Sequence, residues 1–221
     1  MTAADAGGQD RAGRRVTTYF ERPGPENTSA VVEAALARAA EIGLDDIVVA
    51  SNTGTTARAL LAGLRDGRGG ARPARTNLVV VTHHVGFRSP GEDEMDPAVR
   101  EELVGAGARL LTTTHLFGGV ERAVTNQFGG LYPGALVAWT LRLFGEGLKV
   151  AVEIAVMALD AGLVPYGRDI LAIGGSGRGA DTAVVVRPSH AKTFFETRVV
   201  EIVCRPLPER RPGGWSGGPA G

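Results

Sequence analysis

Short apolar runs alternate along this chain with segments in which apolar residues recur every three or four positions. Two runs, at residues 47–50 and 78–82, are apolar at nearly every position. Strands that are buried on both faces of a parallel sheet have this pattern, whereas strands with one solvated face alternate between apolar and polar residues. The pattern therefore predicts an α/β fold in which helices cover both faces of a mostly parallel sheet.

The boundaries of the helices follow from the residues that begin and end them. Asn27 or Thr28 begins a helix that Gly43 ends, and Asp96 with Pro97 begins a helix that runs to about residue 104. The predicted helices cover residues 28–42, 55–64, 97–104, 119–126, 133–144 and 149–161. The predicted strands cover residues 47–50, 78–82, 107–114, 169–173, 182–187 and 199–204. Because no helix of normal length separates the last two strands, we expect one of them to run antiparallel.

The composition fits one domain with a sizeable core and no strong electrostatic preference. The chain has 221 residues, of which 43% are hydrophobic, and its 24 basic residues balance its 24 acidic ones. A neutral chain has no general attraction to nucleic acid or to membranes, so we expect neither as a partner. The single cysteine, Cys204, excludes an internal disulfide and a cysteine zinc site. The histidines lack metal-binding spacing, so we expect no metal.

Both ends of the chain differ in composition from its middle. Residues 1–15 and 207–221 are rich in Gly, Pro, Arg and Ala, so we predict two disordered tails around a single domain at residues 16–206. The first tail has no apolar segment typical of a secretory signal, and no apolar run approaches the roughly 20 residues that span a bilayer. We therefore expect a cytoplasmic protein.

The turn after the first predicted strand is rich in small polar residues. It consists of Ser51, Asn52, Thr53, Gly54, Thr55 and Thr56, and we call it the 51–56 turn. A helix N-terminus offers unpaired N–H groups and a favourable dipole, and glycine permits a close approach of the backbone, so this turn suits a phosphate. The alternative is a capped turn whose hydroxyls only satisfy the helix start. Four hydroxyls and a glycine favour the anion site, although no G-K-[ST] follows as in a P-loop.

Two further loops follow predicted strands and carry histidines. Their residues of interest are, in chain order, His83, His84, Gly86, Phe87, His115, Gly118 and Gly119. If the strands are parallel, both loops lie beside the 51–56 turn. A histidine there can bind a phosphate or transfer a proton, and a phenylalanine can stack on a flat ring. Surface loops with structural histidines are the alternative, and we interpret the acidic trio at residues 92–94 as a solvated face.

A single carboxylate interrupts the apolar pattern of the helix predicted at residues 149–161. If Glu153 is buried, it needs a partner. That partner is either Lys149, one turn back on the same helical face, or a ligand group. A third role for Glu153 is to hold a proton for transfer. The sequence does not decide between these alternatives.

A second glycine-rich segment, residues 174–183, joins two predicted strands. It contains Arg178, Gly179, Asp181 and Thr182. The guanidinium can reach a phosphate or a carbonyl, and the side chains of Asp181 and Thr182 can hydrogen-bond to the edge of a ring. A flexible hairpin is the alternative. No helix follows, so the dinucleotide fingerprint is absent and NAD is not expected.

Several segments together resemble a known family. The stretch "VVASNTGTTARAL" resembles the phosphate-binding turn in the C-terminal α/β domain of pyruvate kinase, which holds a sugar-phosphate effector in some of those enzymes. From about residue 19 to 206 the chain is similar to stand-alone archaeal and bacterial proteins with that fold, through "YFERPGPENT", "VVVTHHVGF", "THLFGGVERA", "GLKVAVEIAVMALDAG" and "GGSGRGADTAVVVRPSH".

The resemblance carries expectations about fold and ligand. It implies a three-layer α/β/α sandwich with a mostly parallel mixed sheet of about five strands and an antiparallel edge strand. It also implies bound flavin mononucleotide (FMN). It implies no pyruvate kinase activity, because the catalytic barrel of that enzyme is missing.

Three functional hypotheses remain open. The first is a protein that binds a phosphorylated small molecule, above all FMN, with the phosphate on the 51–56 turn and the ring across the neighbouring loops. The second is a non-redox enzyme acting on a sugar phosphate, with His83, His84 or His115 and Glu153 as acid–base groups. The third is a module without catalysis that senses a phosphorylated metabolite through a partner or a homo-oligomer interface.

Overall fold

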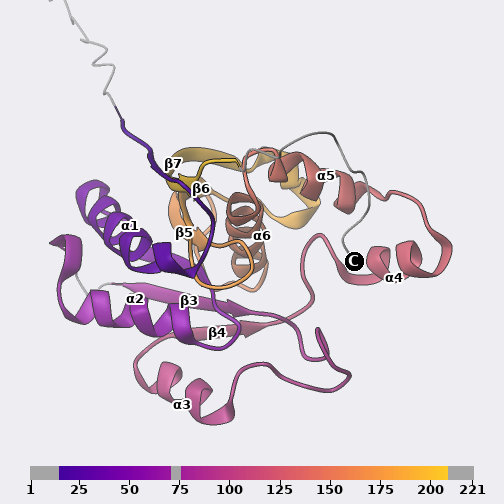
Figure 1. Ribbon diagram of the computed structural model, residues 1–221, viewed down its shortest axis with the longest axis horizontal. Helices are drawn as coiled ribbons and strands as arrows, with labels where there is room; N and C mark the ends of the chain where they lie inside the picture. Colours follow the sequence, from indigo (N-terminus) through magenta and orange to yellow (C-terminus); the bar gives the residue numbers. More distant parts are fainter. Residues whose placement is uncertain (1–14, 71–75, 209–221) are drawn as a thin grey trace, which may run out of the picture.

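The computed structural model describes residues 15–70 and 76–208 (Figure 1). The two predicted tails lie outside the described residues except for residues 15, 207 and 208, and so do residues 71–75 of the glycine-rich loop. The described strands form one seven-stranded sheet in the order β1-β7-β6-β5-β2-β3-β4. Their bounds are β1 Thr18–Phe20, β2 Asp46–Ala50, β3 Asn77–Thr82, β4 Arg109–Thr112, β5 Ile170–Gly174, β6 Thr182–Arg187 and β7 Arg198–Pro206.

The sheet is mixed, as predicted, but it differs from the expected sheet in two details. It has seven strands rather than the about five that the resemblance implies. The apolar runs predict six of them, and the seventh, β1, has three residues and is too short to give a periodic pattern in the sequence. The antiparallel strand is β6, which pairs with β5 on one side and β7 on the other. It therefore lies inside the sheet and not at its edge, and β1, which pairs in parallel with β7, is the edge strand on this side.

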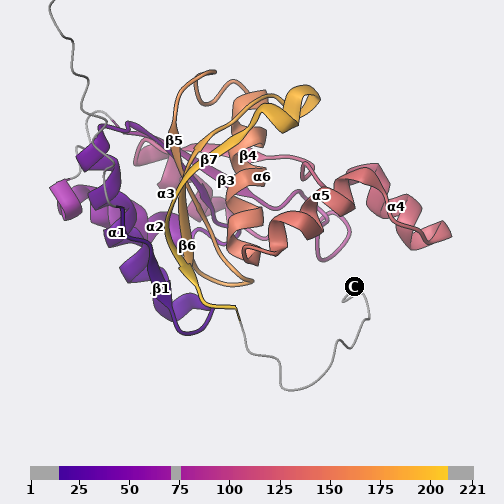
Figure 2. The same ribbon diagram turned by 90° about the horizontal axis from the view of Figure 1, so that it is seen from above.

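Helices cover both faces of the sheet, which confirms the three-layer sandwich. Helices α1 to α3 lie on one face and α6 on the other, while α4 and α5 extend outward from the α6 side (Figures 1 and 2). The bounds are α1 Thr28–Ile42, α2 Thr55–Arg65, α3 Pro97–Gly105, α4 Gly119–Phe128, α5 Pro133–Arg142 and α6 Glu146–Asp160. None of the helices in the described residues is both long and apolar enough to cross a membrane.

The core consists of two clusters, one on each face of the sheet. In β2, Ile47 and Val49 pack toward α1 and α2, while Val48 between them packs toward α6. All three side chains are at most 1% exposed. This two-sided burial explains why the central strands are apolar at every position, and it fixes their register, because a shift by one residue would exchange the two faces.

Capping residues account for most helix ends. The Asp96 side chain accepts a hydrogen bond of 2.8 Å from the N–H of Ala98 at the start of α3, and Gly43 ends α1 with φ at 71°. Helix α6 begins at Glu146, three residues before the predicted start, directly after Gly145 with φ at 111°. The additional turn brings the N-terminus of α6 to the carboxyl end of β5, where Gly174 packs against the backbone of Gly147.

The edge of the sheet joins the two ends of the described chain. Strand β1 pairs in parallel with the end of β7, where Thr18 lies opposite Cys204. An ion pair of 2.8 Å between Arg15 and Glu201 extends this contact, and Arg38 of α1 also bonds to Glu201 at 2.8 Å. Glu201 of β7 thus joins the segment before β1 to β7, and β7 to α1.

Candidate functional site

Four neighbouring parallel strands end at the same edge of the sheet. In register, Val49 of β2 lies opposite Ile173 of β5, Ala50 opposite Val81 of β3, and Thr82 opposite Thr112 of β4. The loops that begin at residues 51, 83, 113 and 175 therefore leave the sheet side by side. Open α/β sheets bind ligands at this edge.

The 51–56 turn connects β2 to the N-terminus of α2. Gly54 precedes the helix with φ at 85°, and a Cβ at this position would lie 2.4 Å from Cγ1 of Val99 in α3. Only glycine fits this position without strain. The Ser51 hydroxyl accepts a hydrogen bond of 3.3 Å from the N–H of Ala57 and so supports the helix start. The N–H groups of Thr55 and Thr56, in the first turn of α2, have no intrahelical acceptor.

The hydroxyls of the turn divide into two groups. Ser51 and Thr56 are buried, whereas Thr53 and Thr55 are exposed and lie 3.2 Å apart between their Oγ1 atoms. The capping interpretation thus applies to Ser51. The exposed pair and the N–H groups of the first turn lie at the positive end of the α2 dipole.

Asn52 joins the turn to the loop after β3. Its side-chain oxygen accepts the backbone N–H of His83 at 2.9 Å, and its Nδ2 lies 2.9 Å from Nε2 of the same residue. On the other side of the ring, Nδ1 of His83 lies 2.5 Å from a carboxylate oxygen of Glu94. Because a carboxylate accepts a hydrogen bond, Nδ1 carries the proton and Nε2 accepts from the amide. Both ring nitrogens of His83 are thus engaged.

The interpretation of residues 92–94 as a solvated face was wrong for Glu94 alone. The Glu94 side chain is 12% exposed and also pairs with Arg88 at 2.9 Å, whereas Glu92 and Asp93 are exposed and Asp93 pairs with Arg100 at the surface at 2.7 Å. The loop folds back on itself through a hydrogen bond of 2.8 Å from Gly86 N–H to the carbonyl of Glu92, and so returns Glu94 to the sheet edge. The turn glycines Gly86 and Gly91 were the sequence signal that could have indicated this return.

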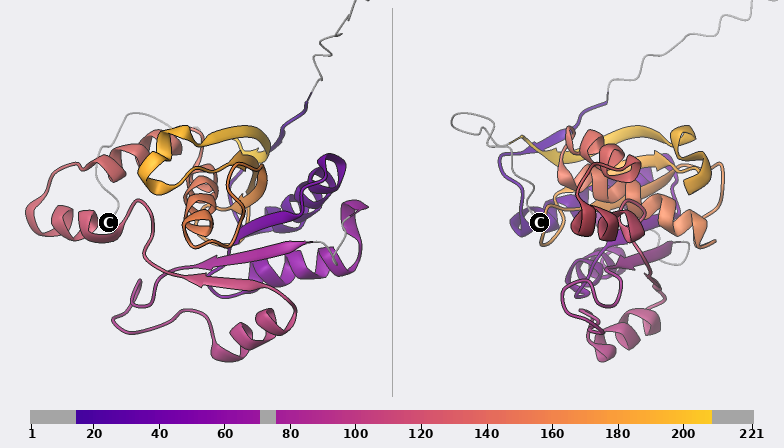
Figure 3. Two further views of the ribbon diagram at one scale, coloured as in Figure 1. Left: turned by 180° about the vertical axis from the view of Figure 1, so that it is seen from behind. Right: turned by 90° about the vertical axis from the view of Figure 1, so that its right-hand side faces the viewer.

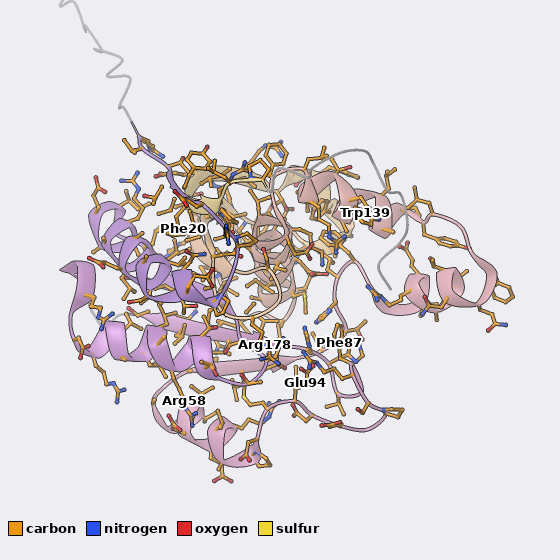
Figure 4. All side chains as sticks on the ribbon, in the orientation of Figure 1. Phe20, Arg58, Phe87, Glu94, Trp139 and Arg178 are labelled. Carbon is orange, nitrogen blue, oxygen red and sulfur yellow. The ribbon has the colours of Figure 1, made fainter. Side chains whose placement is uncertain are left out.

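The structure brings the three predicted histidines together around Phe87. The rings of His83 and Phe87 are stacked with their centroids 3.7 Å apart, and the His115 ring lies 5.2 Å from His83 and 5.3 Å from Phe87. The His84 ring lies 5.5 Å from Phe87 and 5.7 Å from His115. Two loops far apart in sequence thus form one cluster, and Phe87 and Glu94 are seen at this edge in Figure 4.

Burial changes the acid–base character of His115. It lowers the pKa of His115 to about 4, with smaller contributions in the same direction from His83, Lys149 and His84, and an opposing one from Glu153. The imidazole is therefore neutral at pH 7. It can donate or accept a hydrogen bond without contributing a positive charge.

Glu153 has the partner that the simpler alternative predicted. Its carboxylate pairs with Lys149 at 2.5 Å and accepts the N–H of Phe117 at 3.1 Å, while Lys149 also lies 5.6 Å from the centre of the Phe117 ring. Lys149 and Glu153 are 8% and 4% exposed. Asp160, on the same helix, bonds instead to His190 at 2.7 Å.

A groove of about 1370 Å³ lies between this edge of the sheet and the helices α4 and α5. Its inner wall includes His84, Gly86, Phe87, His115, Gly118, Gly119, Lys149 and Glu153. The 51–56 turn does not line the groove but adjoins it, because Asn52 bonds to His83 and His83 stacks on Phe87. The candidate site therefore has a polar part at the turn and an aromatic part in the groove.

The glycine-rich segment between β5 and β6 contributes less to the groove than its composition suggested. Asp181 and Thr182 are 0% exposed: the Asp181 carboxylate accepts the N–H of Ser176 at 3.0 Å and the hydroxyl of Thr182 at 2.8 Å. Gly179 packs against the segment that precedes α1, where a Cβ would lie 2.5 Å from Cα of Pro25. Arg178 is exposed at the tip of this loop, and Ser176 reaches the groove.

Comparisons with known proteins agree with the fold. The family model described as "Pyruvate kinase, alpha/beta domain" matches residues 29–186, which is more than half of the chain. In the described residues, no group of three or more His, Cys, Asp or Glu side chains is arranged to hold a metal ion.

Similar solved structures include pyruvate kinases from Cryptosporidium parvum. One has 14% identity and a TM-score of 0.36 over 72% of this chain and 22% of its own. Another, in complex with ADP, has 14% identity and a TM-score of 0.37 over 76% of this chain and 25% of its own. This chain therefore corresponds to about a quarter of the length of those enzymes.

Proposed function

We propose that this chain, which belongs to the family of the pyruvate kinase alpha/beta domain, binds a phosphorylated small molecule at the carboxyl edge of its sheet, with FMN as the leading candidate. The observation that supports this proposal is the connection of two complementary surfaces. The 51–56 turn offers N–H groups and hydroxyls at a helix N-terminus, and the Asn52–His83 link joins it to an aromatic groove.

The phosphate would be bound by the N–H groups of Thr55 and Thr56 and by the exposed hydroxyls of Thr53 and Thr55. Helix N-termini bind phosphates because their dipole and their unpaired N–H groups both favour an anion. The side chain of Arg178, exposed on the neighbouring loop, is the further cation that we assign to this ligand. Gly54 lets the turn pack closely against α3, where Val99 leaves no room for a side chain, and so fixes the position of the two threonines that follow.

The ring would lie in the groove against Phe87, His84 and His115. A flat heterocycle stacks on such side chains, and the neutral His115 can hydrogen-bond to its edge. The groove exceeds the range of about 300–1000 Å³ that is typical of small-molecule sites, so its size admits a mononucleotide. A bound flavin would supply redox chemistry, for which this chain would provide the orientation and the exclusion of water.

The visible absorbance of the purified protein tests the proposal, with Thr55→Asp and Thr55→Asn as a matched pair. Asparagine and aspartate are similar in size, but only aspartate places a negative charge beside the phosphate. Because aspartate suits the first turn of a helix, Thr55→Asp should remain folded. We expect a flavin band in the wild type and in Thr55→Asn, and its loss in Thr55→Asp. A colourless protein that does not take up added FMN would refute the flavin assignment.

A second candidate function is acid–base catalysis on a sugar phosphate without a flavin. The neutral His115, with a pKa of about 4, and the nearby Glu153 favour it, because both line the groove. A thermal-shift screen of sugar phosphates, followed by turnover assays with His115→Asn, tests it. Binding without turnover would favour the third alternative, a metabolite sensor.

A further inference from the structure

Helices α4 and α5 carry a large apolar surface that the rest of the described chain does not cover. We call residues 119–144 the arm; it projects from the sandwich on the side of α6 (Figures 2 and 3). Helix α4 contains no buried residue. Seven large apolar side chains of the arm are 50–79% exposed, namely Val120, Phe128, Leu131, Leu136, Trp139, Leu143 and Phe144.

This exposure is too large for a free surface. From the sizes and exposed fractions of the seven side chains, the apolar area is about 800 Å². Apolar patches on monomers rarely exceed a few hundred Å² without a functional reason. A ten-residue helix with no packing is also marginal in water, so α4 needs a contact to remain folded.

The arm is nevertheless a defined element. The Glu121 carboxylate accepts the N–H of Gly134 at 2.9 Å, which joins α4 to the start of α5. An ion pair between Arg142 and Glu146 joins the end of α5 to α6. The side chain of Ala138 is buried, whereas Trp139 beside it is 55% exposed and lines the groove (Figure 4). The arm is therefore held in place with its apolar side uncovered.

We propose that the arm of a second copy of this chain covers this surface, in a two-fold symmetric dimer. The area available on one chain matches the about 800 Å² that each partner of a stable complex buries. A two-fold interface uses the same patch on both chains, and an apolar centre with few charges suits such contacts. The arm has only three charged residues, Glu121, Arg122 and Arg142, and the whole chain is neutral, so two copies do not repel each other.

The dimer would also close the groove. Ala138, Trp139 and Leu143 form the outer wall of the groove opposite His84 and Phe87. A second arm packed on this wall would restrict solvent access to the aromatic part of the candidate site. The interface itself does not depend on which ligand binds there.

Analytical ultracentrifugation of the full chain over a wide concentration range tests the proposal, with and without FMN. Phe128→Glu and Leu143→Glu each place a charge in the interface, and the matched control Val104→Glu places one on α3, where Val104 is 55% exposed. We expect a dimer whose dissociation constant rises about 30-fold or more in each arm variant and is unchanged in the control. Circular dichroism verifies that the variants are folded.

Three results would overturn the proposal. One is a monomer at every concentration, and another is a dimer that neither arm variant weakens. The third is a monomer whose arm is covered by residues 209–221. In that case the amides of α4 would be protected from hydrogen exchange in the full chain but not in a chain that ends at Pro208. If the protein fails the absorbance test but still forms the dimer without FMN, the interface is supported although the proposed flavin function is refuted.

Discussion

Replacing Gly54 with alanine tests whether the 51–56 turn is held by its close approach to α3. Gly54 has φ at 85°, and this left-handed conformation costs alanine about 1–2 kcal/mol. A Cβ would also lie 2.4 Å from Cγ1 of Val99, and overpacking of this kind costs about 1–3 kcal/mol. We therefore expect Gly54→Ala to lower the free energy of unfolding by about 2–5 kcal/mol.

Two further variants separate the two contributions. Gly43 has φ at 71°, and a Cβ at this position would meet no atom within 4 Å, so Gly43→Ala should cost only the conformational part, about 1–2 kcal/mol. In a Val99→Ala background the clashing methyl group is gone, and the nearest remaining atom, Cδ1 of Leu103, lies at 3.6 Å. In the Val99→Ala background, Gly54→Ala should therefore lower the free energy of unfolding by no more than Gly43→Ala does in the wild type.

Urea unfolding of these variants, with linear extrapolation to water, gives the required free energies. The difference between the cost of Gly54→Ala in the two backgrounds is the coupling energy with Val99. The reasoning is refuted if Gly54→Ala and Gly43→Ala are equally destabilising in the wild type. It is also refuted if Val99→Ala leaves the cost of Gly54→Ala unchanged.

Two other predictions concern the groove. Because the pKa of His115 is about 4 in the folded chain and has the ordinary value of 6.5 in the unfolded chain, only the unfolded chain binds this proton between those values. The free energy of unfolding should therefore fall by about 2–3 kcal/mol through His115 as the pH decreases from 6.5 toward 4, whereas above pH 6.5 this loss is absent. When the free energy from urea unfolding is plotted against pH, His115→Asn should give a shallower slope than the wild type. Lys149→Met leaves the Glu153 carboxylate buried without its cation and should cost about 3–5 kcal/mol, much of which Lys149→Met/Glu153→Leu should restore in thermal unfolding. Equal stability of the single and double variants would contradict this account.

The sandwich could be predicted because its strongest signals are local. The apolar runs at residues 47–50 and 78–82 reflect burial on both faces, and Gly43 and Asp96 cap their helices by contacts within a few residues. The features that the sequence did not reveal depend on distant partners. Strand β1 is a strand only because β7 pairs with it.

The candidate site divides in the same way. The 51–56 turn was recognisable because strand, glycine and helix follow one another directly. The grouping of His83, His84 and His115 followed once the strands were taken as parallel. The role of Glu94 was missed, because it depends on a loop that folds back, and nothing local distinguishes it from the exposed Glu92. The uncovered surface of the arm was also missed, since helical periodicity gives an apolar side but not its partner.

The pairing of β1 with β7 has a consequence for the order in which the molecule folds and opens. Arg15 and Glu201, which meet at this edge, are 186 positions apart in the chain. Contacts of such sequence separation are slow to form, because the loop that they close costs the most entropy. We expect the hairpin of β5 and β6 to form early and the β1 edge to close last. In the native protein the same three-residue strand should be the first to detach, so its amides should exchange with solvent faster than those of β2 and β3.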